Sequence, residues 1–392
     1  MAGEKRIIEE IIEKFGGRFA GSPEEFAAQG FFAERLSGIC DRVIREPFFS
    51  ALTSMHGSLK IFCGLFWLSL LIARRDPGLA LVLSAANALL MLTHFIFFGK
   101  ILDFAFDKQR SENVTGVIEP SGKAERILII SGHMDSTTEY QWWFAFKNLG
   151  GVLSALAGLL ILSFPLLLAV HYALTCFSPG PCWTRWYLDV FTGLSPLCAT
   201  LFFMRSEKVV DGAQDNLSGI AVAFACAKEL SGKARPEGPA LTRTRVLICS
   251  FGAEEAGLNG SSAWVKAHLA ALPSAKTVCV NLDGVMLESE LRIIKAEIFP
   301  LVRYPEHIVC AMKEAFTAAG VEPKVSVIPM GATDAVPFAR KKIPAVSIIG
   351  LPVNGLHETY HTRLDRVECV EEGALAKAAA IVCAFAKKLD EE

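Results

Sequence analysis

The sequence predicts an α/β protein, a three-layer α/β/α sandwich around a mixed, largely parallel sheet that two apolar helical hairpins interrupt. From residue 205 onward, short apolar strand-like segments alternate with segments of helical periodicity, a pattern typical of a parallel sheet covered by helices. Two blocks, 59–99 and 148–204, are much more apolar than the rest of the chain. The whole chain is 52% hydrophobic and only 20% charged, which is more apolar than a typical soluble protein.

The N-terminal part predicts two helices and a strand. Isoleucines recur at helical spacing over residues 4–15, and a Gly-Gly pair ends that helix. Ser22 followed by Pro and two glutamates predicts the start of a second helix, which runs to about Gly38. The segment DRVIREPFF (41–49) then predicts a strand.

Strands and helices alternate through the rest of the polar chain. The expected strands are RILIISG (126–132), RVLICSF (245–251), TVCVNLDG (277–284), KVSVIPM (324–330) and PAVSIIG (344–350). The expected helices are IAVAFACAKEL (220–230), SAWVKAHLAAL (262–272), HIVCAMKEAFTAAG (307–320) and GALAKAAAIVCAFAKKL (373–389). Together these elements predict one discontinuous domain made of residues 1–58, 100–147 and 205–392.

The two insertions are predicted to be transmembrane hairpins. Each holds two apolar segments, at about 59–73 and 79–98 in the first insertion and about 149–177 and 186–204 in the second. Most of these segments approach or exceed the roughly 20 residues that cross a bilayer. Because each insertion holds an even number of segments, the chain returns to the side from which it left. The prediction is therefore an integral membrane protein with four transmembrane segments; apolar lids or a dimer interface are the alternative.

Charge and cysteine usage favour a cytoplasmic α/β domain. Basic residues on the α/β side of the apolar segments outnumber those at the hairpin tips, which are Arg74, Arg75 and Arg185. The chain has 11 cysteines without regular spacing, which is typical of buried, reduced thiols. A net charge of −2 offers no basic surface for nucleic acid.

Five places put metal-ligand side chains directly after apolar segments, where α/β sheets carry their sites. They hold His133 with Asp135, Asp215, the pair Glu254-Glu255, Asp283, and His357 with His361. A histidine can bind zinc through one ring nitrogen while a carboxylate holds the other. Taken singly, Asp215 can simply cap the helix that follows it. A solvated acidic turn fits the glutamate pair poorly, because the pair ends a buried strand and has no lysines nearby.

The order of these motifs resembles that of the co-catalytic zinc aminopeptidases, metallopeptidase family twenty-eight, whose relatives include glutamate carboxypeptidase and glutaminyl cyclase. The similarity includes GGRFAGSPEEF (16–26), the strand and motif of 113–136, and about 209–388, with GATDAVPF (331–338) and IPAVSI (343–348). The apolar insertions depart from the family pattern but leave every motif residue in place.

The resemblance implies a zinc exopeptidase with two zinc ions per chain and a peptide substrate with a free N-terminus. It implies that Asp215 bridges both ions, that His133 and Asp283 complete one site, and that Glu255 and His361 complete the other. It further implies Glu254 as the general base and Asp135 as the residue that orients His133.

Several readings stay open at this point. A glutaminyl cyclase uses one zinc and no hydrolytic water, and a carboxypeptidase has the same ligand set. A membrane scaffold with a silent site is the alternative from another class, although no ligand position is missing.

Overall fold

The computed structural model describes residues 3–177, 186–235, 237–352 and 358–392. The chain divides into two compact units, each described by itself below. The first, which we call the α/β unit, comprises Met1–Leu52, Lys108–Thr138 and Lys208–Glu392. The second, which we call the helical unit, comprises Thr53–Asp107 and Glu139–Glu207 and contains both apolar insertions.

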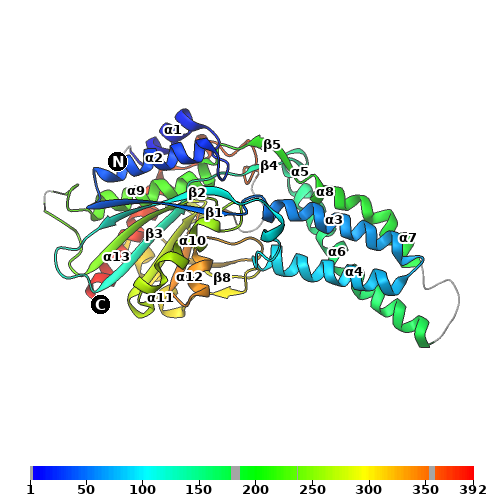
Figure 1. The fold of residues 1–392 in the computed structure, drawn as a ribbon. Coiled ribbons are helices and arrows are strands. Elements are labelled where there is room, and N and C mark those ends of the chain that lie inside the picture. The colour runs from blue at the N-terminus through cyan, green and yellow to red at the C-terminus, as the bar shows by residue number, and fades with distance from the viewer. Residues whose placement is uncertain (1–2, 178–185, 236, 353–357) are drawn as a thin grey trace. The chain divides into compact units, whose positions relative to one another are not determined.

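A nine-stranded sheet forms the centre of the α/β unit (Figure 1). Its order is β1-β2-β6-β3-β7-β11-β8-β10, and β9 pairs with β8. The strands are β1 (Arg42–Ser50), β2 (Gln109–Ile118), β3 (Arg126–His133), β6 (Thr244–Phe251), β7 (Thr277–Asp283), β8 (Arg292–Glu297), β9 (Val302–Arg303), β10 (Lys324–Ile328) and β11 (Ala345–Ile349). The neighbours β6, β3, β7 and β11 run parallel to one another, as do β8 and β10. Strand β2 is antiparallel to both of its neighbours, β1 and β6, and β11 is antiparallel to β8. The predicted mixed, largely parallel sheet is therefore confirmed.

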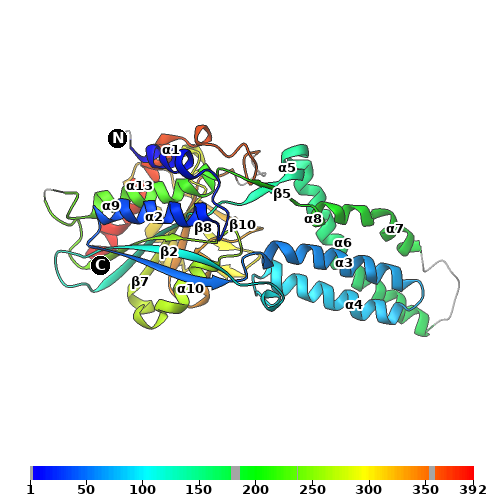
Figure 2. The same cartoon turned by 45° about the horizontal axis from the view of Figure 1, so that its top comes forward.

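Helices cover both faces of this sheet, as a three-layer sandwich requires. On one side α9 (Ser218–Leu230) packs on β3, β6 and β7 and against α1 (Glu4–Phe15) and α13 (Glu372–Glu391), with α2 (Pro23–Ser37) beside β2. On the other side α10 (Asn259–His268) packs against α12 (Ala335–Arg340). Figures 1 and 2 show α1, α2 and α9 on one side and α10 on the other. A further helix, α11 (Glu306–Ala318), packs on β8 and α13.

The strand sequences match their places in the sheet. Leu128, Ile129 and Ile130 of the central strand β3 are fully buried, because a parallel strand with helices on both sides is apolar on both faces. The edge strand β1 is partly exposed along its length and contains Pro47, which an edge position tolerates. Apolar packing thus fixes the positions of β3, β6 and β7. Candidate metal-ligand residues lie at or just after the ends of these strands.

The helical unit consists of the two apolar insertions and their connections. The first forms α3 (Ser54–Ala73), α4 (Pro77–Leu90) and a π-helical continuation, η1 (Met91–Ile96). The second forms α5 (Gln141–Phe146), α6 (Asn148–Phe177), α7 (Trp186–Leu194), the 3-10 turn η4 (Ser195–Cys198) and α8 (Ala199–Phe202). Two short strands, β4 (Thr138–Tyr140) and β5 (Arg205–Val209), pair with each other.

Among the described residues, three helical stretches are long and apolar enough to cross a membrane: Ser54–Ala73, Pro77–Ile96 and Asn148–Leu174. The first begins at Ser54, five positions before the segment expected at 59–73. The fourth segment, expected at 186–204, is not one helix. It is interrupted at Pro196, which cannot donate a backbone hydrogen bond, and its neighbours form a 3-10 turn.

Polar residues inside the apolar helices turn toward the interior of the helical unit. The His94 ring is fully buried, accepts a hydrogen bond from the Leu102 N–H at Nδ1 (3.0 Å) and lies 3.2 Å from Ser54 Oγ at Nε2. The Asn87 amide donates to the Phe62 carbonyl (2.9 Å). Large apolar side chains point outward instead, and Leu71 is 75% exposed. Buried polar side chains and exposed large apolar side chains are the distribution expected of helices that face lipid.

Candidate metal centre

Three parallel neighbours bring the first candidate residues to one edge of the sheet. His133 is the last residue of β3, Asp283 is the last residue of β7, and Glu254 follows the end of β6 by three positions. Because β3 lies between β6 and β7 in parallel register, the carboxyl ends of all three strands meet. The sheet topology alone therefore places these side chains together.

Asp215 reaches the same place from an irregular turn ahead of α9. The turn spans Ala213–Leu217, and its Asp215–Asn216 peptide bond is cis. The Asn216 side chain donates to the Leu282 carbonyl (2.8 Å) and accepts from the Gly219 N–H (3.0 Å), which ties the turn to β7. The Asp365 carboxylate accepts from the backbone N–H groups of Gln214 (2.7 Å) and Asp215 (3.3 Å). Both hydrogen-bonded anchors hold the backbone and leave the Asp215 carboxylate available.

Six side chains form two groups of three metal-ligand donors. One group holds His133, Glu254 and Asp283, and the other holds Asp215, Glu255 and His361; within each group the donor atoms lie within 4.8 Å of one another. The two carboxylate oxygens of Asp215 join the groups. Its Oδ1 lies 3.1 Å from His133 Nε2, and its Oδ2 lies 3.1 Å from His361 Nε2.

The glutamate pair sends one side chain to each group. Glu254 Oε2 lies 3.7 Å from His133 Nε2, and Glu255 Oε1 lies 3.2 Å from His361 Nε2. The backbone here is a turn, and Ala253 before the pair has a left-handed φ of 54°. His361 also has a left-handed φ, 53°. Such conformations are costly for non-glycine residues and cluster at functional sites.

Asp135 contacts the imidazole ring of His133 and also binds the backbone of the glutamate pair. His133 Nδ1 lies 3.1 Å from the Asp135 carbonyl oxygen and 3.5 Å from the Asp135 carboxylate. The carboxylate oxygens accept from the backbone N–H groups of Glu254 (2.9 Å) and Glu255 (3.0 Å). Asp135 therefore links the β3 and β6 loops, a connection that the sequence did not indicate. The remaining candidate, His357, lies outside the described residues.

Burial and mutual repulsion dominate the electrostatics of the cluster. Burial raises the pKa of Glu254 well above its usual range; His133 opposes the rise, and Asp334 and Asp283 add to it. Burial and the Asp215 charge likewise raise the pKa of Asp283. For Asp215 burial acts in the same direction, but hydrogen bonds from His133 and His361 outweigh it and hold its pKa below the usual range.

The donor set fits zinc. Imidazole nitrogens and carboxylate oxygens are ordinary zinc ligands, and several buried carboxylates together need a positive charge to remain ionised. Burial opposes ionisation of His133, yet the neighbouring Glu254 and Asp135 carboxylates raise its pKa well above the usual value. The protein thus concentrates negative charge where a cation would relieve it.

Two buried acids near the cluster had no role in the sequence analysis. Glu25 is fully buried and accepts from the Ala253 N–H (2.8 Å) and the Gly21 N–H (2.6 Å), although its place after Ser22-Pro23 predicted only a favourable helix start. Burial and Asp135 raise the pKa of Glu25 to about 8. Asp334 is also fully buried and contributes to the raised pKa values of Glu254 and Asp283. Their membership in the family-like segments 16–26 and 331–338 was the available signal.

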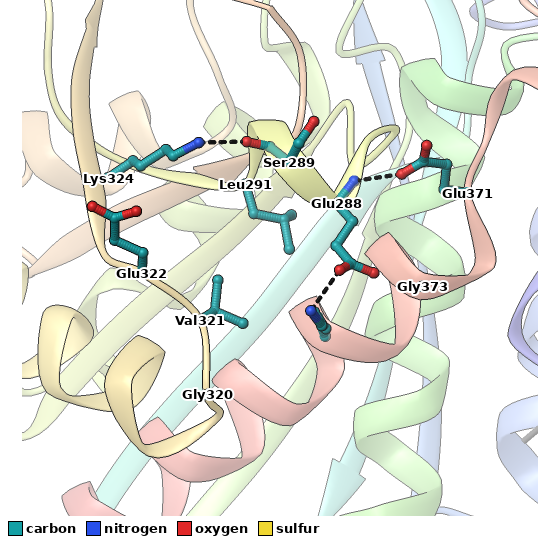
Figure 3. A pocket seen from close by; sticks show the side chains of 10 residues that line it. Glu288, Ser289, Leu291, Gly320, Val321, Glu322, Lys324, Glu371 and Gly373 are labelled. Atoms are coloured by element: carbon teal, nitrogen blue, oxygen red, sulfur yellow. Dashed lines mark hydrogen bonds and ion pairs between the residues drawn. The ribbon is translucent and has the colours of Figure 1, made fainter.

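A pocket in the α/β unit, shown in Figure 3, involves other residues. It lies between the end of α11 and the start of α13, and none of the six donors lines it. Lys377 forms an ion pair with Glu288 (2.5 Å), and Lys324 donates to the Ser289 carbonyl (2.7 Å).

The sheet order and the donor cluster at its edge define the fold of a zinc-dependent exopeptidase, and comparison with solved structures agrees. A zinc aminopeptidase from Bacillus subtilis matches with a TM-score of 0.57 at 16% identity, over 98% of this chain and 93% of that one. A Zn-dependent exopeptidase from Parabacteroides distasonis matches with a TM-score of 0.56 at 14% identity (97% and 95%). A glutaminyl cyclase from an Acidobacteriales bacterium matches with a TM-score of 0.56 at 12% identity (99% and 94%).

Residues 199–386 match the model of Peptidase family M28. A comparison with curated proteins found no match. The family match over residues 199–386 and the shared fold confirm the predicted resemblance to peptidase family M28. The family match and the similar solved structures support a zinc-dependent metallopeptidase acting on peptides. The individual roles of the six donors and of Asp135 stay predictions.

Proposed function

We propose that the chain is a membrane-associated aminopeptidase that removes N-terminal residues from peptides, with two zinc ions and Glu254 as the general base. The placement of Asp215 carries the proposal. Its two carboxylate oxygens each lie 3.1 Å from Nε2 of a different histidine, and each histidine belongs to a different group of donors. A carboxylate in this position can bridge two cations.

In this proposal His133 and Asp283 hold one zinc ion, and Glu255 and His361 hold the other. When bound, the zinc ions make water a nucleophile at neutral pH and polarise the scissile carbonyl. Glu254 lies beside the first pair without being needed as a ligand. Its carboxylate, 3.7 Å from His133 Nε2, is placed to accept a proton from the attacking water and pass it to the leaving amine. Asp135 holds the Glu254 and Glu255 backbone and so fixes where both side chains begin.

We further propose that the helical unit spans the membrane four times, with the α/β unit in the cytoplasm. The three long apolar helices support this, as does the outward direction of residues such as Leu166 (68% exposed). The interrupted segment α7–η4–α8 would provide the fourth crossing. Digestion of the α/β unit by a protease added outside sealed cells would contradict the cytoplasmic orientation.

Glu254→Gln is the direct test of the proposed chemistry. We expect a loss of aminopeptidase turnover of at least about 100-fold, the usual contribution of a general base, with the zinc content of the wild type. Turnover on a panel of aminoacyl substrates and zinc content by elemental analysis are measured on the same preparation. Glu322→Gln, an exposed glutamate in the remote pocket, is the matched control. Loss of zinc together with turnover would assign Glu254 as a ligand and remove it as the base.

The same preparation separates the remaining activities. The similarity in fold to a glutaminyl cyclase makes cyclisation of N-terminal glutaminyl peptides the second assay. Cyclisation without hydrolysis, at one zinc per chain, would replace the aminopeptidase proposal. Release of C-terminal residues would indicate a carboxypeptidase. Absence of both zinc and turnover in the wild type would indicate a membrane scaffold.

A further inference from the structure

We propose that Arg18 is a positioning residue of the metal centre, whose guanidinium sets the separation between the loops that carry His133 and Asp215. The inference rests on the proposed two-zinc site, which needs these two side chains at a defined distance. Arg18 lies in the segment between α1 and α2 and is fully buried.

The guanidinium joins two loops that are far apart in the sequence. Its Nε donates to the carbonyl of Met134 (2.8 Å), the residue directly after His133. Nη1 donates to the carbonyl of Asp211 (2.9 Å), and Nη2 donates to the carbonyl of Gly212 (3.3 Å), three positions before Asp215. One rigid, planar group therefore contacts the backbone close to both residues.

Ser136 repeats the connection next to the guanidinium. The Arg18 N–H donates to Ser136 Oγ (2.9 Å), and the Ser136 N–H donates to the Arg18 carbonyl (2.9 Å). Ser136 Oγ donates onward to the Val210 carbonyl (2.8 Å). The backbone around Arg18 thus lies between the two loops and is hydrogen-bonded to both.

Gly212 shows how closely the two loops approach each other at this point. It has a left-handed φ of 60°, and a Cβ at this position would lie 2.6 Å from the Ser136 Cβ and 3.2 Å from Arg18 Nη2. Only glycine fits both the backbone conformation and the space. The turn that leads to Asp215 is consequently pressed against the Arg18 contacts and cannot shift toward them.

Arginine is the side chain that this place requires. The hydrogen-bond acceptors of its guanidinium are carbonyls of Gly16, Met134, Asp211 and Gly212. A buried charge is costly without compensation, and the nearby carboxylates Asp135 and Asp365 supply it at longer range. A lysine carries its donors on a single atom and cannot span both loops with the same geometry.

The test uses Co²⁺ as a probe in the purified full-length protein, because its visible absorption reports the ligand geometry. We compare the wild type with Arg18→Met and Arg18→Lys. Arg245→Met, which removes a half-exposed arginine paired with Glu119, is the matched control. Co²⁺ affinity is measured by competition with a chelator, and folding by circular dichroism.

We expect Arg18→Met to bind Co²⁺ about 10- to 100-fold more weakly at one or both sites, the usual effect of removing a residue that orients ligands. Its absorption bands should shift, Arg18→Lys should lie between Met and the wild type, and Arg245→Met should match the wild type.

Wild-type affinity and spectrum in a folded Arg18→Met would overturn the inference while leaving the two-zinc site intact. If Arg18→Met does not fold, Arg18→Lys decides: unchanged Co²⁺ binding in that variant overturns the inference. A wild type that binds no Co²⁺ would instead overturn the proposed function, and the inference with it.

Discussion

Buried acidic residues in this chain fall into two kinds with different physical roles. In the first kind, the carboxylate oxygens face other metal-ligand side chains, as those of Asp215 face two histidines. Others hold the backbone, as Asp135 and Asp365 do beneath the loops of the metal centre. The first kind belongs to motifs that are visible in the sequence. The second kind is recognised only when its backbone partners, more than 100 positions away, are known.

Glu297 is another buried acid that holds the backbone, over a shorter distance along the chain, and it leads to a prediction about stability and pH. It is fully buried at the end of β8, and its carboxylate accepts from Thr333 Oγ1 (2.7 Å), the Thr333 N–H (2.9 Å) and Tyr304 Oη. Burial raises the pKa of Glu297 from 4.5 to about 7. The folded protein therefore binds a proton more readily than the unfolded chain between these values, and this contribution to stability is lost as pH rises through about 7.

Glu297→Gln should remove that pH-dependent contribution. The free energy of unfolding of the wild type, relative to the variant, should fall by about 3 kcal/mol between about pH 4.5 and pH 8. Denaturant unfolding of both proteins across this range measures the difference, with Glu322→Gln as an exposed control. A constant difference between wild type and Glu297→Gln at all pH values would show that Glu297 has an ordinary pKa.

Whole elements differ in how well their sequences predict them. The strands β3, β6 and β7 are continuous apolar runs, so they were expected close to their observed bounds. Strand β8 was not expected, because Arg292, Lys295 and Glu297 interrupt its apolar pattern. Its place between β11 and β10, antiparallel to one and parallel to the other, depends on pairing partners and not on its own composition.

The start of α10 packs closely against the turn that precedes Glu254, and a substitution at Gly260 tests this packing. A Cβ on Gly260 would lie 2.2 Å from the Gly252 carbonyl oxygen and 2.5 Å from Asn113 Oδ1, so Gly260→Ala must move α10 or the turn before Glu254. We expect a loss of about 1–3 kcal/mol in the free energy of unfolding. Gly30→Ala in α2 is the control, since its Cβ would meet only the flexible end of Arg45 at 3.3 Å, and alanine should stabilise that helix by about 0.5–1 kcal/mol. Equal effects of the two substitutions would contradict this packing.

The whole molecule combines a conventional soluble fold with a second unit of unusual composition. The three long apolar helices keep polar groups inside and leave large side chains such as Leu159 (60% exposed) outside. The free-energy cost of a charged side chain at such a position depends on whether water or lipid surrounds it. An exposed leucine in water tolerates lysine, whereas a lysine near the middle of a bilayer costs about 2.5–3.5 kcal/mol.

Leu159→Lys therefore separates a membrane hairpin from a water-facing lid. We expect a clear drop in the fraction of protein that stays in the membrane pellet after alkaline carbonate extraction. Leu301→Lys, at a 72% exposed position of the α/β unit, should leave that fraction unchanged. An unchanged pellet fraction for Leu159→Lys, or a wild type that is extracted without detergent, would favour an apolar lid.

The sequence by itself determined the α/β class, the apolar segments and the types of side chain at the sheet edge, because these depend on local periodicity and on residues that directly follow strands. Only the tertiary structure shows which donor atoms lie close together, since His133, Asp215 and His361 come from separate strands and turns. It also revealed the buried contacts of Arg18, Glu25 and Asp365. These contacts join segments far apart along the chain, and local pattern contains no information about which distant carbonyl or N–H a buried charge will meet.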